Sequence, residues 1–199
     1  MLKEERKILY EIGSTTTLEE CQIIYDLVLS LNDNDIIVDL GTGLSRTACA
    51  MAFACVGTKR KVYTVDNYSE SKRYAVELTK QKHLQQFQLW SHNVATENIT
   101  KAGLSDYITQ VVGESFDTSF IPNQVAMIFI DASHIYEAVK KDILAWLPKI
   151  RPGGFFTGHD WGVRSSDELG VVRAVTETIL VSGCEFKVKE RVWVAKIKE

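Results

Sequence analysis

Four aspartates of the sequence each stand at or just past the end of a short apolar segment: Asp39, Asp66, Asp131 and Asp160. Carboxylates that meet at one place can accept hydrogen bonds from hydroxyl groups, hold a cation or take part in proton transfer. If the apolar segments are parallel strands, their carboxyl ends share one edge of the sheet, where open α/β sheets bind ligands. The pattern favours a ligand site over the alternative that these acids merely mark where strands reach the surface.

Two histidines accompany the last two aspartates. His134 follows Asp131 in "DASHIYE", and His159 directly precedes Asp160 in "GHD". Imidazole gains and loses a proton near neutral pH, so either ring is a candidate general base. The start of a helix disfavours a positive ring at His134, whereas the nearby Asp131 favours it. His134 is therefore either a catalytic base or only a residue at the start of a helix.

A glycine-bearing turn, "DLGTGLSRT", follows the first apolar segment. Gly41 and Gly43 allow the backbone to curl tightly and to approach a ligand closely. The dinucleotide fingerprint G-x-G-x-x-G would need a small third residue where Arg46 stands, which counts against an NAD site. An ordinary turn between a strand and a helix is the simpler alternative.

Asp66 ends the second apolar segment. The number of residues between the glycine-bearing turn and Asp66 is close to the roughly 20 that separate such a turn from a ribose-binding acid. Its two carboxylate oxygens can accept hydrogen bonds from both hydroxyls of a ribose. A cap for a helix beginning in "NYSES" is the alternative. The segment "VVGES" adds Glu114 and Ser115, small and polar groups that could border an adenine.

The segments between these residues alternate between strand and helix. Helical spacing or composition predicts helices over residues 17–31, 45–57, 69–104, 135–147 and 167–181, and apolar runs predict strands over residues 35–40, 61–66, 107–113, 125–131 and 153–160. Two alternating segments, residues 185–189 and 192–198, predict a terminal hairpin. The expected fold is α/β: a Rossmann-like, doubly wound, mostly parallel seven-stranded sheet with a C-terminal antiparallel hairpin and helices on both faces.

Several residues predict where these elements begin and end. Thr17 and Glu20 have the spacing of a capping box, Gly103 should stop a helix, and "RPGG" should form the turn before the fifth strand. No linker or repeat divides the chain. We expect one domain over residues 1–199, with an N-terminal helical segment (1–33) and a Rossmann-like core (34–199).

The composition is that of an ordinary globular protein, with 45% hydrophobic and 25% charged residues and a net charge of −3. This charge provides no general attraction to nucleic acid or to an anionic membrane. The four cysteines lack CxxC spacing, and the N-terminus lacks the apolar core of a secretory signal, so we expect a cytoplasmic protein with reduced thiols. We expect a small-molecule substrate; the N-terminal helices could serve as a lid or as a homodimer surface.

Taken together, these segments resemble the class I S-adenosylmethionine-dependent methyltransferases. The resemblance runs from about Asp35 to the hairpin and rests on "VDLGTG", "VYTVDNY", "VVGESFD" and "IFIDASHIYEAVKKDILAWLPKIRPGG". The last stretch most resembles small bacterial enzymes linked to O-methylation of sugars or natural products. S-adenosyl-L-methionine is the cofactor that the resemblance implies.

The resemblance also implies a role for each residue of the rim. Asp39, Gly41 and Gly43 would surround the methionine part of the cofactor, Asp66 would bind the ribose, and Glu114 with Ser115 would border the adenine. Asn67 would also belong to the cofactor site. Ser45 replaces a frequent third glycine and could cap the following helix. Asp131 completes the implied cofactor set.

The same rim resembles that of the catechol-type, divalent-metal-dependent O-methyltransferases. By that resemblance Asp131 would be a metal ligand, His134 would stand in the place of the catalytic base, and His159 with Asp160 would supply further ligands. Oxygen ligands suit Mg²⁺, and a histidine among them favours ions such as Mn²⁺. The usual base there is lysine and the usual ligand at position 159 is a carboxylate, so the metal stays an open alternative.

The reaction implied is the transfer of a methyl group to a hydroxyl, with Asp131 and His134 as catalytic residues. The protein would align donor and acceptor and remove the hydroxyl proton. Alternatives are a catalytically silent cofactor-binding module and an NAD(P)-dependent oxidoreductase. An RNA methyltransferase would need a basic face, and the Asn/Asp-Pro-Pro-aromatic motif of amino-methylating enzymes is replaced by "DASH".

Overall fold

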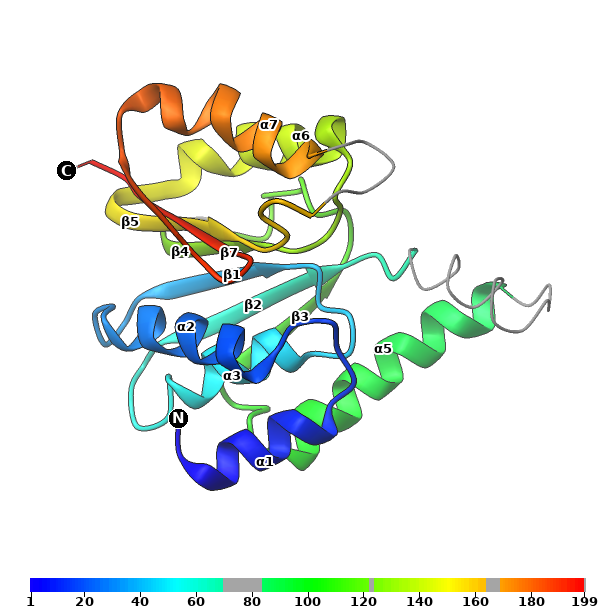
Figure 1. The fold of residues 1–199 in the computed structure, drawn as a ribbon. Helices are drawn as coiled ribbons and strands as arrows, with labels where there is room; N and C mark the ends of the chain where they lie inside the picture. Colours follow the sequence, from blue (N-terminus) through cyan, green and yellow to red (C-terminus); the bar gives the residue numbers. More distant parts are fainter. Residues whose placement is uncertain (70–83, 122–123, 164–168, 199) are drawn as a thin grey trace.

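The computed structural model describes residues 1–69, 84–121, 124–163 and 169–198, and seven strands in these residues form one sheet (Figure 1). The strands are β1 (Ile36–Leu40), β2 (Lys61–Asp66), β3 (Ile108–Val112), β4 (Val125–Ile130), β5 (Ile150–Gly158), β6 (Glu185–Lys189) and β7 (Val192–Lys196). Their order is β3-β2-β1-β4-β5-β7-β6; β1 to β5 are parallel, and β7 is antiparallel to β5 and β6. The predicted sheet and hairpin are confirmed.

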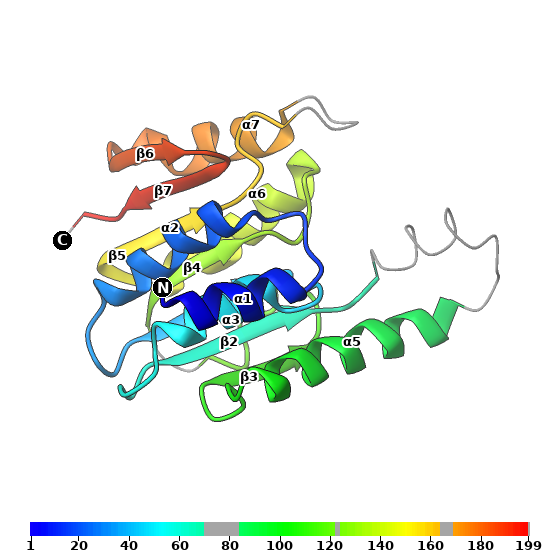
Figure 2. The same cartoon turned by 60° about the horizontal axis from the view of Figure 1, so that its bottom comes forward.

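Helices cover both faces of this sheet. They are α1 (Lys3–Glu11), α2 (Leu18–Leu29), α3 (Arg46–Phe53), α5 (Leu84–Lys101), α6 (Tyr136–Trp146) and α7 (Gly170–Thr178), with short 3-10 turns at Leu147–Lys149 and Leu180–Ser182. In the views of Figures 1 and 2, α6 and α7 lie on one side of the sheet and α1, α2, α3 and α5 on the other. Of the predicted helices, residues 70–83 and 167–168 fall outside the described residues.

Strand residues alternate between two hydrophobic cores. Ile37 pairs with Met127 and belongs to the core beneath α1, α2 and α3, whereas Val38 pairs with Ile128 and belongs to the core beneath α6 and α7. All six residues of β4 are buried, as expected for a central parallel strand covered on both faces. The centre of the sheet is therefore a rigid base for the loops at its carboxyl edge.

The starts of two helices differ in how well they were predicted. The capping box is confirmed: the backbone N–H of Glu20 donates to Thr17 Oγ1 (3.2 Å), and the N–H of Thr17 donates to Glu20 Oε2 (2.7 Å). The predicted cap at Ser45 is wrong. Ser45 has φ 78°, and its hydroxyl donates to the carbonyls of Leu44 and Ala95 instead of accepting from α3. Its left-handed backbone turns the side chain away from the free N–H groups of the helix.

The fifth strand begins earlier than predicted. β5 starts at Ile150, so "RPGG" is part of the strand and not the turn before it. The register jumps there, because Ile150 pairs with Val125 and Phe155 with Met127. The additional residues of β5 between Ile150 and Phe155 form a bulge-like irregularity. Backbone hydrogen bonds of Gly153 and Gly154 with Ile197 keep this part of the chain in the sheet.

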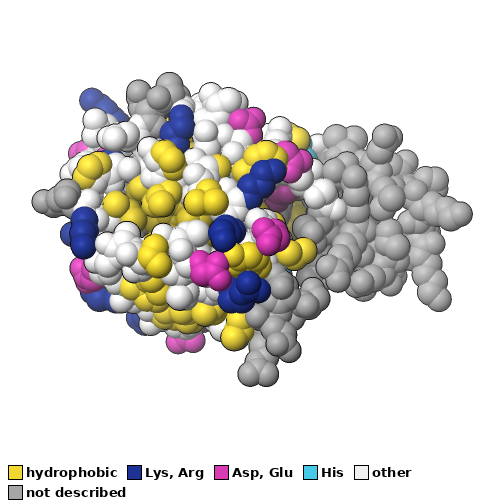
Figure 3. Space-filling model, turned by 90° about the horizontal axis from the view of Figure 1, so that it is seen from above, with side chains coloured by type: hydrophobic (Ala, Val, Ile, Leu, Met, Phe, Trp, Pro, Cys, Tyr) yellow, Lys and Arg dark blue, Asp and Glu magenta, His cyan; other side chains and the backbone are white. Residues whose placement is uncertain are grey.

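The surface over α6 and α7 is mixed in character (Figure 3). Basic and acidic side chains lie beside one another there, among hydrophobic ones. Leu144 of α6 is one of the large hydrophobic residues that are exposed. In the described parts of the chain, none of the helices has the length and apolar character needed to cross a bilayer.

Candidate functional site

A cavity of about 920 Å³ lies at the carboxyl ends of the parallel strands. Its wall combines the turn after β1, the end of β2, the loops after β3 and β4, one face of α6, and the segment between α1 and α2. The volume falls in the range of about 300–1,000 Å³ that is usual for small-molecule sites. The cavity therefore occupies the predicted edge of the sheet.

The turn after β1 is fixed by its glycines. Gly41 has φ +102°, and a Cβ at this position would collide with the backbone carbonyl of Asp131. Only glycine therefore allows the end of β1 to pack directly against the end of β4. Gly43 then donates its backbone N–H to Oδ2 of Asp66 (2.9 Å), which joins the turn to the end of β2.

Asp66 and its neighbours form the next part of the wall. Oδ1 of Asp66 accepts a hydrogen bond from the backbone N–H of Tyr68 (2.6 Å), which fixes the orientation of the carboxylate. Asn67 donates through Nδ2 to Oε1 of Glu114 (3.0 Å) and so connects the loops after β2 and β3. The cavity wall contains seven residues of the predicted cofactor set: Gly41, Gly43, Asp66, Asn67, Glu114, Ser115 and Asp131.

The other two predicted cofactor residues, Asp39 and Ser45, do not reach the cavity wall. Both are fully buried beneath the turn. Asp39 accepts hydrogen bonds from Thr64 (3.0 Å) and Thr47 (3.2 Å). Burial, reinforced by the charge of Asp131, raises the pKa of Asp39 to about 8. Asp39 thus supports the turn from below, as a largely protonated acid at neutral pH.

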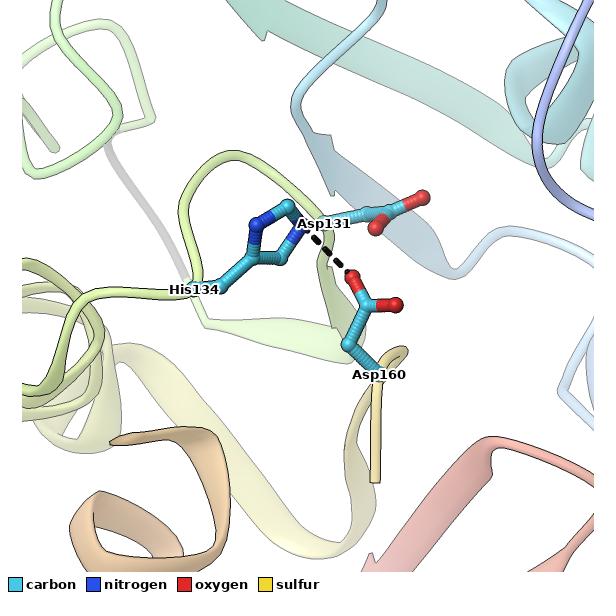
Figure 4. Close-up of side chains that lie close together, drawn as sticks. All are labelled: Asp131, His134 and Asp160. Carbon is cyan, nitrogen blue, oxygen red and sulfur yellow. Dashed lines mark ion pairs between the residues drawn. The ribbon is translucent and has the colours of Figure 1, made fainter. Parts of the chain in front are cut away.

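His134 and Asp160 form an ion pair at the carboxyl edge of the sheet. Nε2 of His134 lies 2.7 Å from Oδ2 of Asp160, and Figure 4 shows the ring and the carboxylate facing each other. His134 belongs to the loop before α6, and Asp160 follows β5 with φ 58°. Asp160 is thus the carboxylate in contact with the ring, and Asp131 also interacts with His134 through its charge, as expected from the sequence. Burial opposes ionisation of Asp160, but His134 and His159 outweigh it and lower its pKa.

His159 is buried among three acids. Its Nε2 lies 3.2 Å from Glu20 Oε1, and its Nδ1 lies 3.3 Å from Asp160 Oδ1 and 3.5 Å from Asp131 Oδ1. These are ion-pair distances, although the ring is not turned to donate a well-aligned hydrogen bond to any of the three. Burial lowers the pKa of His159, but the carboxylates of Asp131 and Asp160 raise it more strongly, to about 10. His159 is therefore a buried cation at neutral pH.

Residues 12–17, which we name the N-terminal strap, form one wall of the cavity through Gly13, Ser14 and Thr15. Arg46 donates hydrogen bonds to the carbonyls of Ile12 and Thr16, two residues of the strap. Arg191, in the hairpin turn, donates to the carbonyl of Thr15 (2.9 Å) and to Oε1 of Glu20 (3.0 Å).

Both arginines therefore hold the strap over the carboxyl edge of the sheet. The carboxylate of Glu20 also faces His159, which in turn faces Asp160. A continuous network of charges therefore joins the strap to the His134–Asp160 pair. Burial opposes the ionisation of Glu20. The hydrogen bonds from Thr17 and Arg191 and the charge of His159 outweigh burial and lower its pKa to about 2.

A divalent ion would find a suitable donor set in the described residues. One ligand atom each from Asp131, His134 and Asp160 lies within 4.8 Å of the others (Figure 4). Two carboxylates and one imidazole fit ions such as Mn²⁺. The predicted set had His159 in the place of His134. In the structure His159 instead supplies positive charge to the same two acids, which weakens their attraction for a second cation.

Sequence reasoning missed several residues of this site. Arg46 had been noted only as a break in the dinucleotide fingerprint, and Arg191 only as a turn residue. Asp142 lines the cavity one helical turn after Ala138. It neighbours Val139 and Ile143 on the buried face of α6, and an acid at such a position was a signal that could have found it.

Comparisons with known proteins agree with this geometry. A family model described as a methyltransferase domain matches residues 38–161. The comparison with curated proteins found no match.

Three solved structures have the same fold. The O-methyltransferase NovP is 15% identical, with a TM-score of 0.70, 94% of this chain covered and 84% of that chain. An O-methyltransferase from Bacillus cereus, in complex with S-adenosylhomocysteine, is 14% identical, with a TM-score of 0.68 and coverages of 100% and 92%. CalS11, a TDP-rhamnose 3'-O-methyltransferase of calicheamicin biosynthesis, is 12% identical, with a TM-score of 0.62 and coverages of 97% and 93%. With the family model matching more than half of its residues, the chain belongs to this family of methyltransferase domains, and its fold is that of the class I S-adenosylmethionine-dependent methyltransferases.

Proposed function

We propose that the protein transfers the methyl group of S-adenosylmethionine to a hydroxyl of a small molecule, a sugar or a natural product. One observation carries the proposal: a single cavity has Asp66 and the glycine turn at one part of its wall, and His134, whose ring lies 2.7 Å from Asp160, at another. The first part suits a nucleoside with a ribose diol, and the second suits removal of a hydroxyl proton.

The residues divide the cavity into a donor region and an acceptor region. Asp66 would accept hydrogen bonds from the ribose hydroxyls, because Gly43 and Tyr68 already hold its carboxylate in place. Gly41 lines the cavity and lets its turn pack against the end of β4, and the methionine part would lie against this turn. The bound cofactor supplies a methyl group already activated by its sulfonium, so the protein has mainly to align the acceptor with it.

His134 would accept the proton of the acceptor hydroxyl. Asp160 would hold the ring in place and stabilise the imidazolium that forms, as a carboxylate does for histidine in hydrolytic triads. Ser14 and Thr15 of the N-terminal strap line the wall and offer hydroxyl groups to a polar acceptor. A polyhydroxylated acceptor matches this lining, and the activity stated for CalS11, methylation of a sugar hydroxyl, supports that class.

A divalent cation is part of the proposal as an aid and not as a requirement. Asp131, His134 and Asp160 would hold it. When bound it would lower the pKa of the acceptor hydroxyl. His134 would then be occupied as a ligand, so the base and the cation are alternative ways to ionise the same hydroxyl.

Isothermal titration calorimetry tests the proposal directly. We expect S-adenosylhomocysteine to bind and NADH not to bind, and we expect transfer of a labelled methyl group to some member of a panel of sugars and phenols. Binding of NADH alone would overturn the assignment in favour of an oxidoreductase. Binding of S-adenosylhomocysteine without transfer to any acceptor would favour a catalytically silent cofactor-binding module.

A further inference from the structure

The N-terminal strap joins two distant parts of the cavity wall. Gly13 of the strap lies against the glycine turn, because a Cβ on Gly13 would come within 3.3 Å of Cδ1 of Leu44. The carbonyl of Thr15 accepts a hydrogen bond from Nη2 of Arg191 in the hairpin turn (2.9 Å). Gly13 and Thr15 both line the cavity. A displacement of the strap would therefore open this side of the cavity.

The guanidinium of Arg191 binds the first turn of α2 as well as the strap. Its Nε donates to Oε1 of Glu20 (3.0 Å), and its Nη2 donates to Oε2 (3.3 Å). A planar guanidinium fits a carboxylate in this two-pronged way, which the single nitrogen of a lysine does not reproduce. The side chain of Glu20 is only 2% exposed, so water and salt weaken this pair less than they weaken a surface ion pair.

The contacts of Arg191 also reach the acid that holds His134. Nη1 of Arg191 lies 3.8 Å from Oδ1 of Asp160. A second route runs through His159, which lies 3.2 Å from Oε1 of Glu20 and 3.3 Å from the same oxygen of Asp160. The side chain that fixes the strap thus belongs to the charge network of the His134–Asp160 pair.

We propose that Arg191 is a positioning residue whose pairing with Glu20, which we name the latch, holds the strap closed over a bound ligand and slows the release of that ligand. Arg191 is not among the described residues that line the cavity, so it acts through the strap and not by touching the ligand. The statement about release rests on the proposed function, because it takes the cofactor as the ligand. The statement about the strap needs no ligand.

Hydrogen exchange read by mass spectrometry tests closure of the strap in the free protein. The N–H groups of Thr16 and Thr17 are hydrogen-bonded in the closed strap, so their exchange reports its opening. In Arg191→Gln we expect exchange of the strap to rise by about tenfold or more, while exchange of α6 stays as in wild type. Arg191→Lys, which keeps the charge and loses the two-pronged geometry, should be intermediate. Lys189→Gln removes an exposed positive charge from the same hairpin and should exchange as wild type does.

Stopped-flow measurement with S-adenosylhomocysteine tests the effect on release. The dissociation rate constant should rise by about tenfold or more in Arg191→Gln, because the loss of one partner of a buried charge pair acts mainly on dissociation. Lys189→Gln should release the ligand as wild type does. Glu20→Gln should also speed release. The double variant should stay within about threefold of the faster single variant, because either change breaks the same latch, whereas independent effects would multiply.

Each outcome decides the question. Unchanged strap exchange or unchanged release in Arg191→Gln would overturn the inference. An equal rise of exchange in α6 would make Arg191 a general stabiliser, and multiplied effects in the double variant would mean that Arg191 and Glu20 act separately; both results overturn it. If wild type does not bind S-adenosylhomocysteine, the proposed function fails together with the statement about release, whereas strap exchange still decides whether Arg191 closes the strap. If Arg191→Gln does not fold, Arg191→Lys decides by the same criteria.

Discussion

Nε2 of His134 and Oδ2 of Asp160 lie 2.7 Å apart, although the two residues come from the loops after β4 and β5 and are separated by a strand and a helix. Asp160 is itself held on its other side by His159, whose Nδ1 lies 3.3 Å from Oδ1. The carboxylate is therefore fixed between two rings, one half-exposed and facing the cavity, the other buried. This arrangement gives His134 a fixed orientation from which to accept a proton.

Replacing His134 by alanine should lower turnover by about 10²–10⁴, because proton removal would lose its base. Affinity for S-adenosylhomocysteine should stay nearly unchanged. His134→Lys should retain more activity than His134→Ala, because lysine can also accept a proton. The measurement is steady-state methyl transfer with any hydroxyl acceptor that wild type methylates, with Glu137→Ala as a control on the first turn of α6. An alanine variant with the wild-type rate would show that His134 is only a loop residue.

Replacing Asp66 by alanine should weaken binding of S-adenosylhomocysteine by about 1.5–3 kcal/mol, the range for a hydrogen bond to a charged group. The loss should include some loosening of the turn, because Gly43 donates to the same carboxylate. Titration calorimetry measures the change. Asp106→Ala, an exposed aspartate before the amino end of β3, should bind as wild type does. Equal affinities in the two variants would remove Asp66 from the site.

Replacing His159 by asparagine should increase affinity for Mn²⁺ at least tenfold. The variant removes the buried cation that pairs with Asp131 and Asp160, so both acids become available to a divalent ion. Wild type should bind Mn²⁺ weakly, and Asp160→Asn should abolish binding. Electron paramagnetic resonance of free Mn²⁺ follows the titration. Tight binding by wild type, unaffected by His159→Asn, would show that the charge of His159 does not compete with the metal.

The stability of the protein should fall as the pH rises from about 6.5 to 10. The pKa of His159 is raised from 6.5 to about 10, so its contribution is complete below pH 6.5 and disappears as the folded ring loses its proton. Asp39, whose pKa is raised from 3.8 to about 8, adds to the loss up to about pH 8, because below that value the folded acid keeps a proton that the unfolded chain has lost. Thermal unfolding in buffer with a chelator should show a flatter pH dependence for His159→Asn.

Two comparisons complete this test. Asp39→Asn, which removes the other titrating group, should keep the part of the slope that belongs to His159. A wild-type slope in His159→Asn would mean that the ring is neutral in the folded protein. On the acid side, the pKa of Glu20 is lowered from 4.5 to about 2, so its contribution is complete above pH 4.5 and is lost below that value.

The sheet and much of the cavity wall could be predicted from the sequence because they follow from local patterns. Six consecutive apolar residues in β4 allow only a buried element, and the acid that follows must lie at the edge of the sheet. The positions of Asp66 and Asp131 in the wall follow from the strand ends in this way. The glycine turn could also be recognised from a short segment, whereas the need for glycine at position 41, where a Cβ would collide with the end of β4, is visible only in the structure.

The pairings within the site could not be predicted, because they depend on side-chain directions and on distant backbone groups. Asp160 contacts His134 from a backbone with an unusual φ of 58°, which no residue spacing reveals. Arg46 and Arg191 bind carbonyl groups of the strap, and carbonyls carry no sequence signal. Asp39 was misplaced because a buried acid and a rim acid look alike at the end of an apolar run.

The pairing of Arg191 with Glu20 joins positions 171 residues apart. During synthesis, Glu20 leaves the ribosome long before Arg191 exists, although the strands that carry the glycine turn and Asp66 are complete much earlier. The strap therefore has one of its two anchors, Arg46, before Arg191 is made and gains the second only when the hairpin forms. A growing chain can thus build the floor of the pocket before the strap has both of its anchors.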